Sequence, residues 1–427
     1  MKTQIKIAVI GLGYVGLPIA LEFSKYHNVT GFDISKKRIE SLKNFKDSNN
    51  ETNISKGSLK KNNIIFTNNK YDLKNCNIYV VCVPTPVFKS TKPDLRNLIN
   101  ACNLISKFIK INDIVIFEST VYPSTTETIC LPLLEKGSNL KCNTNNNSQS
   151  GFFIGYSPER INPGDQNHNL SNTKKLVSSN SSRGLQKIYS LYKKIIKTDV
   201  IKVNSIQVCE SSKIIENVQR DVNIALMNEF AKIFRKMDLD INEIIKYAST
   251  KWNFIKFYPG LVGGHCIGVD PYYLSYIAKK NNIDPKLIIS GRKINDNMYL
   301  HIIKRISNIC LKKNINISKS NVLIMGYAFK ENCSDIRNTQ VKKIHEYYKK
   351  KSKNVEIYDP LINNDKDLIN KLTIIKKPKK NFYKIIIVCV PHKKILSLSS
   401  NYIKQLQKSN SIVFDLKNSF NRNYFSI

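Results

Sequence analysis

The stretch Ile5-Lys-Ile-Ala-Val-Ile10, followed directly by Gly11-Leu-Gly-Tyr-Val-Gly16, decides the fold of the first part of the chain. Its first half is an apolar run of strand length, and its second half has glycine at the first, third and sixth positions. A helix-like run over residues 17–26 comes next, and a second strand-like run over residues 29–33 ends in Asp33. This order of strand, glycine turn, helix, strand and acid is the context in which G-x-G-x-x-G predicts a dinucleotide-binding α/β domain.

Each residue of this turn has a physical role in holding a dinucleotide. Gly11 permits the tight turn, Gly13 lets a pyrophosphate approach the backbone, and Gly16 lets helix and strand pack closely. The amino terminus of the helix supplies unpaired N–H groups to the phosphates. Asp33 is placed to hold the adenosine ribose hydroxyls, which favours NAD over NADP. Arg38, on the next predicted helix, braces the adenosine side or is simply solvated.

Length and charge limit the class of protein. The chain has 427 residues, enough for two or three domains with a sizeable core, and its formal net charge is +36. The basic residues are spread along the whole chain, whereas a nucleic-acid-binding protein should show clustering. Drift in an AT-rich genome accounts for such a Lys-, Asn- and Ile-rich composition, so we expect no nucleic-acid partner.

The spacing of the cysteines tests for a metal site, and the hydropathy of the chain tests for a membrane-spanning or secretory segment. The ten cysteines form neither a CxxC pair nor a Cys/His cluster, so no metal site is predicted. The amino terminus enters the first strand without a signal-like segment, and no apolar run approaches the roughly 18 residues of a membrane span. We therefore expect a cytoplasmic protein with reduced thiols and no membrane partner.

One cysteine differs from the others by its neighbours. Cys266 lies in Gly260-Leu-Val-Gly-Gly-His-Cys-Ile-Gly-Val-Asp-Pro-Tyr-Tyr273, where the glycines allow the backbone to crowd against a ligand. The carboxylate of Asp270 follows four residues later. An inert buried cysteine in a glycine-rich turn is the alternative, but the spacing favours a catalytic nucleophile at Cys266.

Polar side chains follow three of the predicted strands. Thr85 and Thr120 each come after one strand, and Glu159 with Arg160 comes after another. In open α/β sheets ligands bind beyond the carboxyl ends of the strands, so the threonines are placed to hydrogen-bond cofactor or substrate, or alternatively to cap the following helices. Glu159 is a candidate general base and Arg160 a candidate phosphate or carboxylate clamp, the alternative being an exposed charge pair at a turn.

The second half of the chain predicts a long helix and another α/β unit. Residues 209–238 contain no proline or glycine and have apolar residues at helical spacing. Lys213 and Asn217 share a face of this helix, with Arg220 one turn further, and a solvated face is the ordinary interpretation. From about residue 320, strand-like runs alternate with helix-like ones and predict a second parallel, Rossmann-like sheet. These runs cover residues 321–326, 355–359, 385–390 and 412–415.

Separated segments, in the same order, resemble the UDP-glucose/GDP-mannose dehydrogenase family over almost the full length. They are Val83-Pro-Thr-Pro86, Glu118-Ser-Thr-Val121, Ser157-Pro-Glu-Arg160, Lys213-Ile-Ile-Glu-Asn217, the Cys266 segment, and Phe329-Lys330 with Asp335-Ile-Arg337. The Cys266 segment is similar to that of the branch oxidising UDP-N-acetylhexosamines. Ser124 replaces the family's usual glycine, and Tyr258 stands where close relatives tend to carry an arginine that can reach a neighbouring subunit's substrate.

The resemblance implies an α/β fold of two Rossmann-like parallel-sheet domains, joined by a long central helix and a helical dimerisation region. It implies an NAD-binding domain over residues 1–204, a central helical domain over 205–315 and a UDP-sugar-binding domain over 316–427. The central region forms the dimer interface in relatives, so a homodimer or higher homo-oligomer is expected.

The resemblance also implies the residues of the site. The catalytic set is Cys266, Lys213, Asn217, Asp270, Glu159 and Thr120. The cofactor-binding set is Gly11, Gly13, Tyr14, Val15, Gly16, Asp33, Arg38, Thr85, Thr120 and Arg337. The substrate-binding set is Arg160, Ile161, Lys213, Asn217, Arg220, Gly263, Phe329, Lys330 and Lys417.

The activity implied is NAD-dependent four-electron oxidation of the C6 hydroxyl of UDP-N-acetyl-D-glucosamine or UDP-N-acetyl-D-galactosamine, through a Cys266 thiohemiacetal and thioester. The product is a uronic acid for a bacterial surface polysaccharide. UDP-N-acetylmannosamine and UDP-glucose are the alternative substrates. A two-electron hydroxyacid dehydrogenase and a nucleic-acid-binding protein remain as alternatives from other classes.

Overall fold

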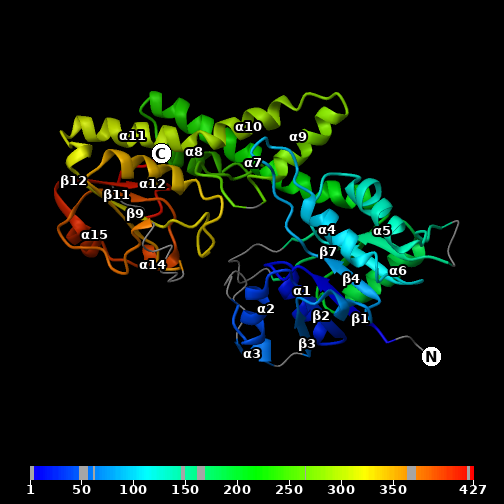
Figure 1. Ribbon diagram of the computed structural model, residues 1–427. Helices are drawn as coiled ribbons and strands as arrows, with labels where there is room; N and C mark the ends of the chain where they lie inside the picture. Colours follow the sequence, from blue (N-terminus) through cyan, green and yellow to red (C-terminus); the bar gives the residue numbers. More distant parts are fainter. Residues whose placement is uncertain are drawn as a thin grey trace. The chain divides into compact units, whose positions relative to one another are not determined.

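The computed structural model describes residues 4–47, 56–60, 63–145, 150–160, 169–264, 266–362, 372–420 and 424–427. The chain divides into two compact units (Figure 1). Unit 1 consists of Met1–Glu216 and Tyr272–Ile283, and unit 2 of Asn217–Pro271 and Asp284–Ile427. Each unit is built on its own sheet, which confirms the predicted α/β fold class. The three-domain division predicted from the sequence stays a prediction.

Unit 1 has an eight-stranded sheet in the order β3-β2-β1-β4-β5-β6-β7-β8. Its strands are β1 (Lys6–Ile10), β2 (Asn28–Phe32), β3 (Ile64–Thr67), β4 (Ile78–Val81), β5 (Ile114–Phe117), β6 (Phe153–Tyr156), β7 (Lys175–Ser179) and β8 (Val200–Val203). The strands β1 to β6 are parallel, and the order reverses at β1, between β2 and β4. Such a reversal is where open α/β sheets bind ligands.

The last two strands depart from the predicted parallel arrangement. Strand β7 pairs antiparallel with β6, and β8 pairs parallel with β7. Parallel neighbours need a crossover connection, usually a helix, and the described residues between β6 and β7 contain none. The chain therefore returns along β6 in the opposite direction.

Alternate residues of β1 face opposite sides of this sheet, as expected from the strand period of two. Ile7 and Val9 pack in one core with α1 (Gly16–Ser24) and α6 (Ser182–Lys193). Ala8 and Ile10 pack in a second core with α4 (Arg96–Ile105). Unit 1 also contains α2 (Lys36–Lys43), α3 (Lys56–Lys60), η1 (Lys70–Leu73), η2 (Thr126–Cys130) and α5 (Leu131–Ser138).

The predicted long helix is α7 (Ile206–Lys236), which has 31 residues and confirms the expectation for residues 209–238 to within about a turn. It is continuous across the division between the two units, which falls after Glu216. The other helices of this half are α8 (Ile241–Ala248), α9 (Asp270–Lys280), α10 (Lys286–Asp296), α11 (Met298–Lys312), η3 (Ile317–Lys319), α12 (Val341–Lys351), α14 (Lys393–Leu396) and α15 (Ser400–Leu406).

Unit 2 has a four-stranded parallel sheet in the order β10-β9-β11-β12. Its strands are β9 (Asn321–Met325), β10 (Asn354–Tyr358), β11 (Tyr383–Val388) and β12 (Gln407–Asp415), which confirms the four runs predicted from the sequence. The two faces of this sheet again form separate cores. Within the part of the chain that the structure describes, no helix is both long and apolar enough to cross a bilayer.

Ser124, where the resembled family has glycine, follows β5 and has φ 75°, in the left-handed region that favours glycine. The turn is fixed there because the backbone N–H groups of Ser124 and Thr126 donate to the carboxylate of Glu210, at 2.6 and 2.9 Å. A side chain at this position therefore strains the backbone.

We expect Ser124→Gly to raise the free energy of unfolding by about 1 kcal/mol, because glycine adopts positive φ without the steric cost of a Cβ. Urea denaturation followed by circular dichroism measures the change. Ser124→Ala is the matched control, since it keeps the Cβ and should give no gain. Equal free energies of unfolding for the two variants would contradict backbone strain at Ser124.

Candidate active site

The glycine turn after β1 has the geometry that a dinucleotide needs. Gly11 has φ +90°, and a Cβ on Gly16 would lie 1.8 Å from the carbonyl oxygen of Gly11. A Cβ on Gly13 would meet nothing within 4 Å, so the space beside it is open for a ligand. Val15, the N-cap residue of α1, makes no side-chain capping bond. The N–H of Leu17 donates to the carbonyl of Gly13 at 3.1 Å and Pro18 has no N–H, so within the first turn the N–H of Gly16 is left to meet a phosphate. These residues fit the pyrophosphate of NAD.

Asp33 and Arg38 hold this turn from the neighbouring strand and helix. The carboxylate of Asp33 accepts from the N–H groups of Leu12 and Ser35, both at 2.9 Å. Arg38 is buried; its Nε donates to the carbonyl of Leu12 at 2.9 Å, and its guanidinium pairs with Asp47. Arg38 therefore braces the turn and is not a solvated residue; its contact with the cofactor stays a prediction.

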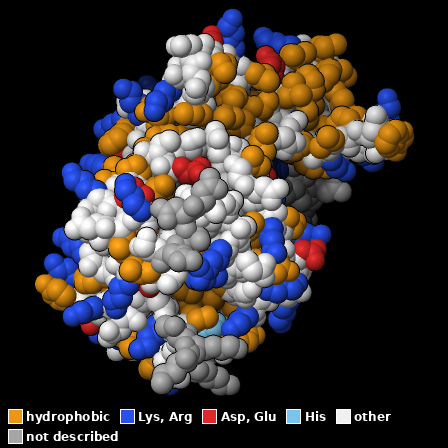
Figure 2. All heavy atoms as spheres, turned by 90° about the vertical axis from the view of Figure 1, so that its right-hand side faces the viewer, with side chains coloured by type: hydrophobic (Ala, Val, Ile, Leu, Met, Phe, Trp, Pro, Cys, Tyr) orange, Lys and Arg blue, Asp and Glu red, His pale blue; other side chains and the backbone are white. Residues whose placement is uncertain are grey.

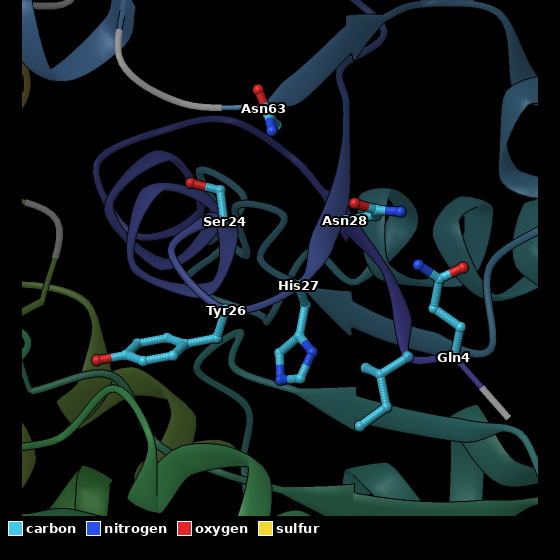
Figure 3. Close-up of a pocket in the computed structure, with 7 residues that line it drawn as sticks. Gln4, Ser24, Tyr26, His27, Asn28 and Asn63 are labelled. Atoms are coloured by element: carbon cyan, nitrogen blue, oxygen red, sulfur yellow. The ribbon is translucent and has the colours of Figure 1, made fainter. Parts of the chain in front are cut away.

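A cavity of about 260 Å³ lies at the amino-terminal ends of the strands of the same sheet, opposite the ends that the glycine turn follows (Figure 3). It is lined by residues that include Gln4, Ser24, Tyr26, His27, Asn28 and Asn63. These residues lie where β1, β2 and β3 begin and where α1 ends, whereas the glycine turn follows the end of β1. None of the predicted site residues lines this cavity.

Thr85 and Thr120 come together at the ends of β4 and β5. The hydroxyl of Thr85 donates to the carbonyl of Thr120 at 2.6 Å, and the Tyr273 hydroxyl donates to the carbonyl of Thr85 at 2.8 Å. Neither threonine caps a helix, because the N-cap residues that follow are Leu95 and Thr125. Both therefore remain candidates for contact with a ligand.

Glu159 is buried at the end of β6, which excludes the alternative of an exposed pair for this residue. Its carboxylate lies 3.7 Å from the Lys213 ammonium of α7. Burial raises the pKa of Glu159 above its ordinary value, and the charges of Lys213 and Lys175 oppose this. Arg160, next along the turn, pairs with Glu216 of α7. Ile161, a predicted substrate-binding residue, lies outside the described residues.

Two buried charges near this turn were missed from the sequence. Glu118 follows β5 directly and Lys175 begins β7, and their side chains form an ion pair at 2.5 Å. In the sequence, each of these charged residues adjoins an apolar strand, which is the one feature that could have indicated burial. Charged residues in such positions are usually solvated, so the burial was not predicted.

In unit 2, Cys266 is the one cysteine of the ten that is partly exposed, and none of the ten is in a disulfide bond. Its carbonyl accepts from the N–H of Asp270 at 2.8 Å, at the start of α9. The Asn217 amide of α7 donates to the carboxylate of Asp270 at 2.5 Å, and both side chains are buried. Arg220, one turn further along α7, is exposed.

The glycines of the Cys266 segment pack against the loop after β9. A Cβ on Gly263 would lie 2.8 Å from the carbonyl oxygen of Asn338, and a Cβ on Gly264, whose φ is +88°, would lie 2.7 Å from the ring of Phe329. The sequence suggested that these glycines make room for a ligand. The structure shows that they also make room for a second protein segment, which carries Lys330; the substrate contact of Gly263 stays a prediction.

Two of the predicted cations of unit 2 lie beside acidic residues. Lys417 pairs with Glu331 at 2.7 Å, and the guanidinium of Arg337 makes two bonds to Asp335, at 2.9 and 2.8 Å. Among the described residues, no group of three or more His, Cys, Asp or Glu side chains is arranged to hold a metal.

The predicted residues thus fall into two groups. Unit 1 contains the glycine turn, Tyr14, Thr120, Glu159 and Lys213, and unit 2 contains Asn217, Cys266, Asp270 and the Phe329–Lys330 loop. The fold and the glycine turn define an α/β protein with a dinucleotide-binding first unit and a second parallel-sheet unit.

Three family models match the chain, in order. Residues 5–196 match the NAD binding domain, 207–297 the central domain and 323–422 the UDP binding domain of the UDP-glucose/GDP-mannose dehydrogenase family. The chain therefore belongs to the UDP-glucose/GDP-mannose dehydrogenase family. It is an NAD-dependent UDP-sugar dehydrogenase.

Individual relatives agree over the full length. Protein CapL of Staphylococcus aureus is 44% identical over 99% of this chain and 97% of its own. The UDP-N-acetyl-D-glucosamine 6-dehydrogenase of Pseudomonas aeruginosa is 44% identical over 97% of each chain. The solved structure of a UDP-D-ManNAc dehydrogenase from Pyrococcus horikoshii is similar with a TM-score of 0.86, at 29% identity over 99% of each chain.

Proposed function

We propose that this chain oxidises the C6 hydroxyl of a UDP-N-acetylhexosamine, either UDP-N-acetyl-D-glucosamine or UDP-N-acetyl-D-galactosamine, to the uronate. The relative named for the glucosamine substrate is 44% identical, whereas the structural neighbour named for the mannosamine substrate is 29% identical. The observation that carries the four-electron reaction is Cys266: it is the one partly exposed thiol, and it adjoins the hydrogen-bonded pair of Asn217 and Asp270.

In the first oxidation, the alcohol loses a proton and a hydride and becomes an aldehyde. NAD supplies the hydride acceptor for this and the second oxidation. Lys213 and Asn217, one turn apart on α7, stabilise the oxygen on which negative charge develops. A buried ammonium is suited to this task because an ionic interaction is stronger away from water.

In the second oxidation, the thiol of Cys266 adds to the aldehyde carbon and forms a C–S bond. The resulting thiohemiacetal loses a hydride and a proton and becomes a thioester. Water then cleaves the C–S bond, which releases the uronate and restores the thiol. Glu159 is the base that takes the proton of this water, and its raised pKa brings it closer to the pH at which a general base is most effective. Asp270 is the second candidate for this role.

We further propose that the chain is a homodimer, active in the cytoplasm, and that its uronate product enters a bacterial surface polysaccharide. Large hydrophobic side chains are exposed on the helices of unit 2, among them Leu226 and Ile233 of α7, Leu287 of α10 and Leu300 of α11. A second copy is the partner that would cover them. Light scattering of the purified chain measures the mass of the particle in solution, and the mass of a monomer would contradict the proposed dimer.

The substrate test uses purified chain, NAD and a panel of UDP-sugars, with NADH measured at 340 nm. We expect UDP-N-acetyl-D-glucosamine or UDP-N-acetyl-D-galactosamine to have the highest kcat/KM and to yield two NADH per sugar. UDP-N-acetylmannosamine and UDP-glucose test the alternative specificities. One NADH per molecule oxidised would instead support a two-electron dehydrogenase, and tight salt-dependent nucleic-acid binding without NADH would support the remaining alternative.

Cys266→Ser should stop the reaction after the first hydride, because the aldehyde lacks the sulfur adduct from which the second hydride leaves. Mass spectrometry of the products should then show an aldehyde or its hydrate and one NADH per sugar. Cys310→Ala, which removes a buried thiol on α11, is the control and should still yield the uronate. Normal uronate formation by Cys266→Ser would remove the covalent step.

A further inference from the structure

Next to the turn that carries Glu159 lies a buried group of three polar side chains from different elements. Glu118, Lys175 and Tyr192 are 1%, 2% and 0% exposed. The Lys175 ammonium donates to one carboxylate oxygen of Glu118 at 2.5 Å, and the Tyr192 hydroxyl of α6 donates to the other. The proposed chemistry uses none of these residues.

Lys175 makes a second bond that reaches the site. Its ammonium donates to the carbonyl of Pro158 at 2.8 Å, and Pro158 immediately precedes Glu159. Ser157 is held as well, because its N–H donates to the carbonyl of Phe117 at 2.9 Å. The backbone that carries Glu159 is therefore tied to β5 through Ser157 and to β7 through Lys175.

Stability alone does not explain this arrangement. Desolvating two charges costs about as much as their mutual attraction returns, and apolar residues of similar size are often equally stable in such places. A buried ion pair is better explained where its charge or its direction has a use.

We propose that Lys175 is a positioning residue for Glu159: it holds the turn by the Pro158 carbonyl and, balanced by Glu118, sets the charge beside the Glu159 carboxylate. This inference rests on the proposed role of Glu159 as the base. It adds to that role the means by which a buried carboxylate is kept in place and its charged form is stabilised.

The charged and titratable groups around Glu159 determine the sign of the effect. They are Lys213 of α7, Lys175 of β7, Glu118 after β5 and Cys82 after β4. Burial raises the pKa of Glu159. The charge of Lys213 lowers this pKa most strongly, and that of Lys175 lowers it next. The charge of Glu118 raises it, but more weakly than Lys175 lowers it. Removing Lys175 must therefore raise this pKa, whether Glu118 stays charged or takes up a proton. Removing the charge of Glu118 must lower it, because Lys175 then has Glu159 as its counter-ion.

The test measures kcat and KM across pH for Lys175→Met and Glu118→Gln in the full chain. A base must be ionised, so the acid limb of the kcat profile reports its pKa in the complex. We expect Lys175→Met to lower kcat about 100-fold, with little change in KM, because a displaced turn misplaces the base. The acid limb of the kcat profile should move to higher pH in Lys175→Met and to lower pH in Glu118→Gln. Lys175→Arg, which keeps the charge, should recover much of kcat.

A control with the same three residue types exists in the other sheet, where the lysine side chain is half exposed and not buried. Lys379 pairs with Glu356 at 2.5 Å, and Glu356 also accepts from the Tyr383 hydroxyl at 2.5 Å, so the same three residue types meet away from the predicted site residues. Lys379→Met should leave kcat and both limbs of the profile unchanged. An equal loss of kcat in Lys379→Met would show a general folding effect and would overturn the positioning role.

Glu159→Gln separates the two proposals. If Glu159→Gln keeps the kcat of the unmodified chain, Glu159 is not the base, and both the base assignment and this inference fail. If Glu159→Gln loses activity but the acid limbs of Lys175→Met and Glu118→Gln do not move, or move in the same direction, only the inference fails. If Lys175→Met does not fold, the pH profile of Glu118→Gln is the test. An acid limb that does not move in this variant would contradict the role of Lys175.

Discussion

A row of buried polar side chains along α7 is the constraint on which the site depends. These side chains recur at intervals of three, four and seven residues and so lie along one side of the helix. They are Glu210, Lys213, Asn217, Asp221 and Asn228, each at most 5% exposed. A buried polar group must find a partner or destabilise the fold, so each of them fixes the segment that it contacts.

Four of the five partner segments contain or adjoin a predicted site residue. Glu210 holds the turn after Thr120, Lys213 meets Glu159, and Asn217 binds Asp270. Further along, the Asn228 amide accepts from the N–H of Gly260 at 2.8 Å and donates to its carbonyl at 3.0 Å, at the start of the Cys266 segment. The Asp221 carboxylate pairs with Arg292 of α10 at 2.6 Å and thereby fixes the rotation of α7 against that helix. Within each unit, α7 therefore holds loops by buried polar contacts, which explains how segments without regular structure can present defined side chains.

The sequence predicted the elements well and the partners poorly. The G-x-G-x-x-G turn and the four strands of unit 2 were predicted because local pattern dictates them, and the long helix followed from its uninterrupted apolar spacing. No local pattern indicated that Lys175 is buried against Glu118, since Glu118 follows β5 and Lys175 begins β7, and the two meet only through the sheet. Likewise, the packing of Gly263 and Gly264 against Asn338 and Phe329 could not be predicted because these neighbours are distant in sequence.

The pairing of buried charges also bears on the net charge of +36. Buried carboxylates need cations or hydrogen-bond donors, so Glu118, Glu159 and Asp221 each take a lysine or arginine into the interior. Arg38 is likewise buried and pairs with Asp47. At the surface, Figure 2 shows Lys and Arg side chains scattered across the visible face among uncharged and hydrophobic ones. A scattered excess of this kind attracts a UDP-sugar or NAD from a distance, whereas a nucleic-acid backbone needs a continuous basic stripe. The charge therefore fits a dehydrogenase that collects two anionic ligands, and the composition requires no further partner to explain it.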